Sequence, residues 1–203
     1  MILGSVVLAG GRSRRMGRPK ESLPIGDNSM LGRTVDTLLS CTFPVVIVAR
    51  DADQELPPVN LECSIILDER IDQGPLMGMM AGLRSVASDC DAVFVTGCDA
   101  PFLTANAVDW LSQQLGGHEV VMAKVDDILQ PLAAIYRTSI LPTIERLVGD
   151  GVHTPRTLAE SCKTRILTEA EIDSFDPSRG FLHNINSPED YEAALTRIEK
   201  SGQ

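Results

Sequence analysis

The sequence has few aromatic residues and no long apolar run. Tryptophan, tyrosine and phenylalanine together make up 4% of its 203 residues, so we expect a core of aliphatic side chains. A transmembrane helix needs about 20 consecutive apolar residues, and no segment approaches that length. We therefore expect no membrane-spanning helix and no membrane partner, and one domain with a substantial core.

Paired cysteines are absent as well. The five cysteines are odd in number, widely spaced and never arranged as CxxC: Cys41, Cys63, Cys90, Cys98 and Cys162. This distribution predicts reduced thiols, and neither a disulfide framework nor a zinc site. The first residues lead directly into an apolar strand and lack the layout of a signal peptide, so we expect a cytoplasmic protein.

Positive charge is scarce, but much of it is concentrated in one segment. The chain has 18 Lys and Arg against 28 Asp and Glu, and its net charge of −10 argues against nucleic-acid binding. Five of the 18 cations fall within nine residues: Arg12, Arg14, Arg15, Arg18 and Lys20. Because crowded like charges repel one another, the cluster indicates a polyanionic ligand. The alternative is a solvated basic loop after an ordinary turn.

The basic cluster follows a short apolar strand at residues 6–8 and a glycine turn at residues 9–11. Glycines let the backbone approach phosphate groups closely, and their N–H groups can point at the oxygens. The spacing is not that of a P-loop, since no Lys directly follows the second glycine, and the adjacent glycines also exclude GxGxxG. Pro19 disfavours helical geometry at the residue before it, so we expect Lys20 on an extended loop.

Strand and helix patterns alternate along the chain. Strands are predicted at 6–8, 45–49, 64–67, 91–96, 119–123 and 131–136, helices at 31–39, 76–86, 104–115 and 140–148, and helix starts at 154–155 and 187–188. Repeated strand–helix units imply an α/β fold in which a mostly parallel sheet lies between two helical layers.

Two carboxylates follow predicted strands. Ligands of open α/β sheets bind outside the carboxyl ends of the strands. Asp99 comes after the strand at 91–96, and it either caps that strand or binds Mg²⁺, which commonly takes one or two carboxylates with water and phosphates. Asp68 ends another strand before Gly74 and Pro75. Asp68 either caps a surface loop or accepts hydrogen bonds from a base or ribose.

The second half of the chain contains three short polar motifs. These are Gln130-Pro131-Leu132, Thr154-Pro155-Arg156 and Asn184-Ile185-Asn186-Ser187-Pro188-Glu189-Asp190. Asn184 and Asn186 face the same side of an extended segment, because one apolar residue separates them. The pair either binds a heterocycle or satisfies a turn before the following helix.

Taken in order, these motifs resemble those of the molybdenum cofactor guanylyltransferase family, within the nucleotidyltransferases that activate small phosphorylated molecules with an NTP. The resemblance runs from Val6 to about Tyr191, and includes LAGGRSRRMGRPK, GPLMG, CDAP, QPL, TPR and NINSPED. The Gly17-Arg18-Pro19-Lys20 segment is similar to that of the cytidylyltransferase relative. Arg50 stands near a strand end where the family often has Asn.

The resemblance implies a Rossmann-like three-layer sandwich of the nucleotide-diphospho-sugar transferase type. It also implies Mg²⁺-dependent transfer of GMP from GTP to molybdopterin, with nucleotide handling in residues 1–103 and pterin handling in residues 104–200. The implied catalytic residues are Arg15, Lys20 and Asp99, with Asp99 as the metal ligand. The implied GTP-binding residues are Leu8, Ala9, Gly10, Gly11, Arg15, Lys20, Asp68, Gly74, Pro75 and Asp99, and the implied pterin-binding residues are Gln130, Arg156, Asn184 and Asn186.

Three alternatives stay open. The enzyme rivals use CTP on the same pterin, or a sugar phosphate as the acceptor. The third alternative is a nucleotide-binding protein that delivers the cofactor without chemistry; it would keep the glycine loop and could lose Asp99, which is present here. Beyond small-molecule substrates, transient contacts are expected with proteins that supply molybdopterin and with molybdoenzyme chaperones.

Overall fold

The structure is a computed structural model that describes residues 1–11, 16–68 and 73–201, and a seven-stranded sheet runs through its centre. The strands are β1 (Leu3–Leu8), β4 (Val45–Ala49), β5 (Ser64–Leu67), β6 (Ala92–Gly97), β7 (Val120–Val125), β8 (Ile128–Arg137) and β9 (Thr164–Leu167), in the spatial order β5-β4-β1-β6-β8-β7-β9. Every pair of neighbours is parallel except the two that include β8. The prediction of a mostly parallel sheet is confirmed.

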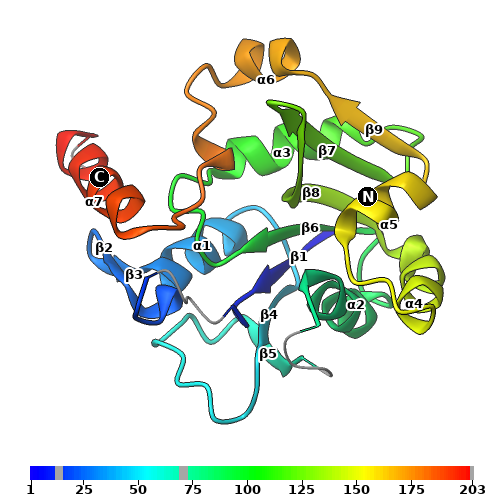
Figure 1. Ribbon diagram of the computed structural model, residues 1–203, viewed down its shortest axis with the longest axis horizontal. Coiled ribbons are helices and arrows are strands. Elements are labelled where there is room, and N and C mark those ends of the chain that lie inside the picture. The colour runs from blue at the N-terminus through cyan, green and yellow to red at the C-terminus, as the bar shows by residue number, and fades with distance from the viewer. Residues whose placement is uncertain (12–15, 69–72, 202–203) are drawn as a thin grey trace.

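Helices cover both faces of the sheet (Figure 1). Their bounds are α1 (Met30–Leu39), α2 (Pro75–Val86), α3 (Ala105–Gln114), α4 (Leu141–Gly149), α5 (Pro155–Ser161), α6 (Glu169–Phe175) and α7 (Pro188–Ser201). The apolar sides of α1, α3 and α6 share one buried core with the sheet, and those of α2, α4 and α5 share the other. The three-layer arrangement expected from the sequence is therefore present.

The central strands are apolar on both sides because each face carries a helical layer. All five residues of β4 are buried, and alternate residues of β1 enter the two cores, Val7 one and Val6 the other. Helix α2 lies unusually close to β1 at Gly82. A Cβ at that glycine would stand 2.3 Å from Cγ1 of Val6, so only a residue without a side chain fits there.

We predict that Gly82→Ala lowers the free energy of unfolding by about 1–3 kcal/mol, because the stiff Val6 side chain cannot move aside. Gly149→Ala is the matched control, since that glycine also lies in a helix but no atom stands within 4 Å of the position of its Cβ. The control should be neutral or slightly stabilising. Urea unfolding of the two variants measures the difference, and equal effects would contradict this description of the contact.

The antiparallel direction of β8 was not predicted. Only Asp126 and Asp127 connect β7 to β8, and both have positive φ, at 49° and 61°. A two-residue turn of this kind joins antiparallel neighbours, whereas a parallel pair needs a long crossover. The sequence lacked the Asn-Gly or Asp-Gly pair that usually marks such a turn.

The expectation of an extended loop at Lys20 was wrong. Lys20 begins a single 3₁₀ turn, Lys20–Ser22, in which the Leu23 N–H donates to the Lys20 carbonyl oxygen at 3.1 Å. Pro19 itself is extended, with φ −57° and ψ 120°. Proline restricts the residues before it but leaves the following residue free to start a turn.

A third, smaller core joins the end of the chain to its beginning. Helix α7 packs against the hairpin of β2 (Pro24–Ile25) and β3 (Asn28–Ser29), as Figure 1 shows. The Tyr191 hydroxyl donates to the Pro24 carbonyl oxygen, and the Arg18 guanidinium lies 5.3 Å from the centre of the Tyr191 ring. This packing brings the segment before α7 to the carboxyl end of the sheet.

No helix in the described ranges is both long and apolar enough to cross a membrane.

Candidate active site

The glycine turn leaves β1 at the carboxyl edge of the sheet, beside the end of β4. The Ala9 N–H donates to the Val48 carbonyl oxygen at 2.9 Å. A Cβ at Gly10 would lie 3.3 Å from the Cα of Arg50, so the close approach of the two chains favours glycine. At Gly11 the same position is open, with no atom within 4 Å. The turn thus exposes backbone where a ligand could approach.

Three of the five cations of the basic cluster, Arg12, Arg14 and Arg15, lie outside the described residues. The role of Arg15 in binding the triphosphate therefore stays a prediction. Lys20, the other cation proposed for catalysis, is described and is largely buried, with 14% of its side chain exposed.

Lys20 connects two residues from distant parts of the chain. Its Nζ donates to Oδ2 of Asp99 at 3.1 Å and to Oδ1 of Asn186 at 3.0 Å. Sequence analysis assigned Lys20 and Asp99 to the nucleotide and Asn186 to the pterin. The structure brings all three to one place, and a site that joins a nucleotide to an acceptor needs such a junction of donor and acceptor residues.

The position of Asp99 follows from the strand before it. Strand β6 is buried along its whole length and ends in Gly97, where a Cβ would stand 2.5 Å from Oδ1 of Asp99. The Asp99 carbonyl oxygen accepts from the Ile185 N–H at 2.9 Å, and the Pro101 carbonyl oxygen accepts from Nε of Arg33 at 2.9 Å. These contacts fix the loop, while 20% of the Asp99 side chain stays accessible to a ligand.

Cys98, the neighbour of Asp99, is not a nucleophile. Its side chain is buried, and burial, followed by the charge of Asp99, raises the pKa of its thiol far above the usual value. A protonated thiol reacts poorly, so Cys98 serves as a small apolar residue of the core.

A second group of predicted nucleotide-binding residues surrounds the start of α2. The Asp68 N–H donates to the Ala49 carbonyl oxygen at 2.8 Å, which continues the sheet beyond β5. The position of a Cβ at Gly78 lies 3.1 Å from Cδ2 of Leu8 and 3.7 Å from Oδ2 of Asp68, so both side chains border the first turn of α2. Gly74, with φ +88°, directly precedes that turn.

Gly74 also contacts the segment before α5. A Cβ at Gly74 would lie 3.0 Å from the carbonyl oxygen of His153, which precedes Thr154-Pro155-Arg156. The two proline-led helix starts, at Pro75 and Pro155, are therefore neighbours, although no sequence pattern linked them.

The residues predicted to bind the pterin divide into two groups. Asn186 contacts Lys20, and Asn184 lies in the same short segment. Gln130 and Arg156 lie at β8 and α5: Gln130 donates to the Ile128 carbonyl oxygen at 3.4 Å. Among the described contacts, none joins the first group to the second.

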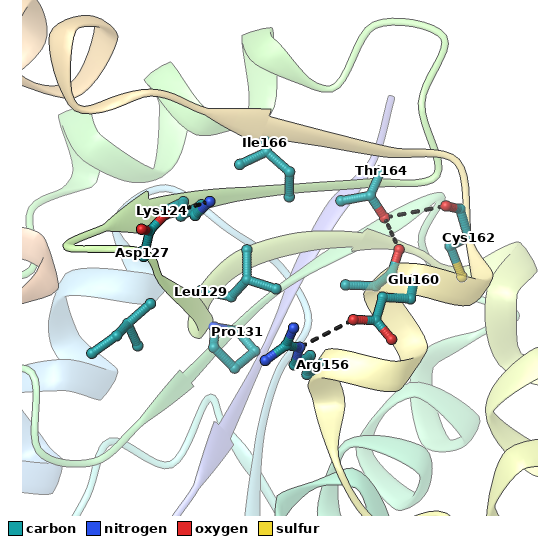
Figure 2. A pocket seen from close by; sticks show the side chains of 11 residues that line it. Lys124, Asp127, Leu129, Pro131, Arg156, Glu160, Cys162, Thr164 and Ile166 are labelled. Atoms are coloured by element: carbon teal, nitrogen blue, oxygen red, sulfur yellow. Dashed lines mark hydrogen bonds and ion pairs between the residues drawn. The ribbon is translucent and has the colours of Figure 1, made fainter.

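Arg156 borders a hollow of about 700 Å³ between α5, β9 and the β7–β8 hairpin. Figure 2 shows Arg156 extending beside Pro131 toward Glu160, with Nε 3.0 Å from Oε1. The guanidinium is largely exposed, with 78% of the side chain accessible. It is therefore open to an anionic ligand, and the pairing with Glu160 is weak enough to exchange.

Sequence analysis missed two polar residues that border the glycine turn. Glu21 follows Lys20 and is only 3% exposed, and Nε2 of Gln54 donates to Oε1 of Glu21 at 2.7 Å. Gln54 belongs to no motif and lies in an irregular segment, so no pattern identified it.

Arg50, which was noted as a departure from the family, pairs with the next residue. Its Nε lies 2.6 Å from Oδ2 of Asp51, and this hydrogen bond lowers the pKa of the Asp51 carboxyl.

Comparison with known proteins identifies the family. Residues 5–166 match the family described as the MobA-like NTP transferase domain. A probable molybdenum cofactor guanylyltransferase from Methanosarcina mazei is 32% identical over 93% of this chain and 88% of its own length. A protein of the same name from Mycolicibacterium paratuberculosis is 34% identical, with 95% of each chain covered.

A solved structure has the same fold. Molybdopterin-guanine dinucleotide biosynthesis protein A from Archaeoglobus fulgidus superposes with a TM-score of 0.79 at 23% identity, covering 97% of this chain and 99% of the other. The fold is therefore of the nucleotide-diphospho-sugar transferase type, as the resemblance implied. On the family match and the relatives together, the chain belongs to the MobA-like NTP transferase family and is a nucleotidyltransferase related to the molybdenum cofactor guanylyltransferases.

Proposed function

We propose that the protein transfers GMP from GTP to molybdopterin and releases pyrophosphate. The observation that carries the proposal is the contact of Lys20 with both Asp99 and Asn186, because it joins a phosphate-binding motif to the acceptor motif. The names of the relatives support the same substrates. In this proposal residues 1–103 handle the nucleotide and residues 104–200 supply the acceptor side.

The reaction balances without a covalent enzyme intermediate. The terminal phosphate of molybdopterin forms a new bond to the α-phosphorus of GTP, and the bond from that phosphorus to the oxygen bridging the β-phosphate breaks. Pyrophosphate leaves with the electron pair. The protein supplies position and positive charge: Lys20, Arg15 and the N–H groups of the glycine turn hold the triphosphate in line with the acceptor.

The residues present are compatible with a magnesium ion. Asp99 is a partly exposed carboxylate that already has a cationic group 3.1 Å from Oδ2, so a cation is tolerated there. Within the described ranges, no group of three or more His, Cys, Asp and Glu side chains forms a metal site. Asp99 would therefore be the main protein ligand, with phosphates and water completing the shell, as Mg²⁺ often requires. Bound Mg²⁺ would neutralise charge on the phosphates.

The proposed base is guanine, and Leu8, Ala9, Asp68, Gly74 and Pro75 are among the proposed GTP-binding residues. This assignment rests on the Gly74-Pro75-Leu76 element and the Asn184-to-Asp190 motif, which are similar to the guanylyltransferases. Two features depart from the guanylyltransferase pattern, segment 17–20 and Arg50. A CTP-dependent cytidylyltransferase therefore stays the alternative.

The choice of base is tested by thermal unfolding with equal concentrations of GTP and CTP in Mg²⁺. A ligand that binds the native state raises stability by RT ln(1 + [L]/Kd), so the tighter nucleotide gives the larger shift. We expect a larger shift with GTP. A larger shift with CTP would overturn the guanine assignment in favour of a cytidylyltransferase.

On the acceptor side we expect Asn186→Ala to raise KM for molybdopterin more than KM for GTP, since Asn186 precedes a helix start able to face an anionic phosphate. Asn106→Ala, an exposed change on α3, is the control and should alter neither value. Equal losses for both substrates would indicate that Asn186 supports the fold through Lys20. Gln130, Arg156 and Asn184 complete the proposed pterin contacts.

The proposal also includes a cytoplasmic location, which suits five free cysteines. Transient contacts with proteins that supply molybdopterin and with molybdoenzyme chaperones remain part of the proposal.

A further inference from the structure

Ala9 and Glu21, which flank the glycine turn and the basic segment in the sequence, contact the same side chain. Ala9 comes directly after β1, and Glu21 directly after Lys20. Nε2 of Gln54 donates to the Ala9 carbonyl oxygen at 2.8 Å and to Oε1 of Glu21 at 2.7 Å. One amide group therefore connects both ends of the segment that carries the phosphate-binding motif.

The orientation of Gln54 is fixed by the turn that precedes it. The Asp53 N–H donates to Oδ1 of Asp51 at 3.0 Å, and the Gln54 N–H donates to the Asp51 carbonyl oxygen at 3.3 Å. The Arg50 N–H, at the end of β4, donates to Oε1 of Gln54 at 2.7 Å. Three of the four hydrogen bonds that a Gln amide can make are thus satisfied, and they fix which end of the amide faces the loop.

The contact with Ala9 determines where the next N–H points. In a planar trans peptide, the carbonyl oxygen of one residue and the N–H of the following residue point in opposite directions. Because the Ala9 carbonyl oxygen faces Gln54, the Gly10 N–H points away from that side chain. Among the described residues, none accepts a hydrogen bond from the Gly10 N–H. This donor is available for a phosphate oxygen.

The contact with Glu21 holds the second of the two flanking residues. Glu21 is 3% exposed, and burying a carboxylate is costly unless a donor is provided. The Gln54 amide provides that donor for Glu21, and Lys20, the residue before Glu21, reaches Asp99. Loss of the amide would leave Glu21 without this donor and would loosen the position of Lys20.

We propose that Gln54 is a positioning residue of the nucleotide site, which holds Ala9 and Glu21 in place and turns the Gly10 N–H toward the triphosphate. This inference rests on the proposed function, since it needs a triphosphate in the loop. It assigns no contact with the reacting atoms to Gln54. Its effect is to hold Ala9, Gly10 and Glu21 in position before the ligand arrives, which lowers the cost of binding.

The test compares Gln54→Met with Gln113→Met. Methionine keeps the length of Gln54 without its amide and without adding charge, and Gln113 is exposed on α3, away from the loop. Calorimetric titration with GTP and with inorganic tripolyphosphate gives Kd, and thermal unfolding gives Tm. We expect Gln54→Met to weaken the binding of both ligands by about tenfold, because the hydrogen bonds to the Ala9 carbonyl oxygen and to the Glu21 carboxylate are lost, and Gln113→Met to change neither.

A charge exchange provides a second readout. Gln54→Glu places two carboxylates side by side and should weaken GTP binding further, while adding Glu21→Gln restores one amide–carboxylate pair between the same positions. The double variant should therefore bind GTP more tightly than Gln54→Glu alone, although the Ala9 contact stays lost. A purely structural residue would show no such recovery in Kd.

The binding and unfolding measurements together decide whether Gln54 positions the nucleotide site. A lowered Tm with unchanged Kd for GTP and tripolyphosphate in Gln54→Met would overturn the positioning role and leave the proposed function intact. If the wild-type protein binds neither ligand, the proposed function fails, and the role of Gln54 fails with it.

Discussion

Replacing Asp99 with Asn is expected to lower turnover by about 100-fold while sparing the fold, since even loss of a group that only supports a metal ligand typically costs about 10–100-fold. Asn keeps a carbonyl oxygen that can accept the hydrogen bond from Nζ of Lys20, and the contacts of the Asp99 backbone do not depend on the carboxylate. What the change removes is the formal charge that holds a hard cation.

The loss of charge at Asp99 should impair the chemical step rather than nucleotide binding. A triphosphate brings several negative charges next to Asp99, and a cation between them makes that proximity favourable. Without added metal, Asp99→Asn should bind GTP as well as the wild type or slightly better, because the change removes a negative charge that repels the phosphates.

Turnover across a Mg²⁺ titration measures this effect, with Asp109→Asn, an exposed change on α3, as the control for loss of one negative charge. If Asp99→Asn keeps the wild-type rate and the same Mg²⁺ midpoint, Asp99 is not the metal ligand. Asp68, at the carboxyl end of β5, then becomes the next candidate.

The second large effect is expected for Lys20→Ala. Removing a charge-assisted hydrogen bond costs roughly 1.5–3 kcal/mol, about one to two decades in GTP affinity or in rate. The stability cost should be small, because Asp99 keeps access to water and partly exposed ion pairs contribute about 0–1 kcal/mol. The fold should therefore survive while function is lost.

Lys163→Ala is the matched control, since Lys163 is exposed at the start of β9 and away from the loop. GTP titration and pyrophosphate release are measured for both variants. Arg15→Ala is expected to resemble Lys20→Ala, from the motif alone. Wild-type affinity and turnover in Lys20→Ala would contradict the assignment of the basic segment to phosphates.

The sequence predicted the elements that depend on local patterns. The all-apolar run of β4 and the proline at the start of α2 were sufficient to place a buried strand and a helix within a residue or two. The direction of β8 was not predictable, because it depends on two Asp residues in left-handed conformation, which is uncommon for residues other than glycine.

The site was predicted in part, for a similar reason. Lys20, Asp99 and Asn186 each belonged to a recognisable motif, yet the contact of Lys20 with Asn186 joins residues 166 positions apart and requires α7 to pack on the β2–β3 hairpin. Gln54 belongs to no motif at all. Its importance follows from three hydrogen bonds that exist only in the folded chain.

The central claim is GMP transfer to molybdopterin, and pyrophosphate release tests it most directly. Purified protein in Mg²⁺ is given GTP, CTP, ATP or UTP in turn, with and without molybdopterin. We expect release with GTP that depends on the pterin, because the acceptor phosphate is the attacking group. Release with CTP alone among the nucleotides would contradict the guanine assignment, and binding of GTP without any release would contradict catalysis.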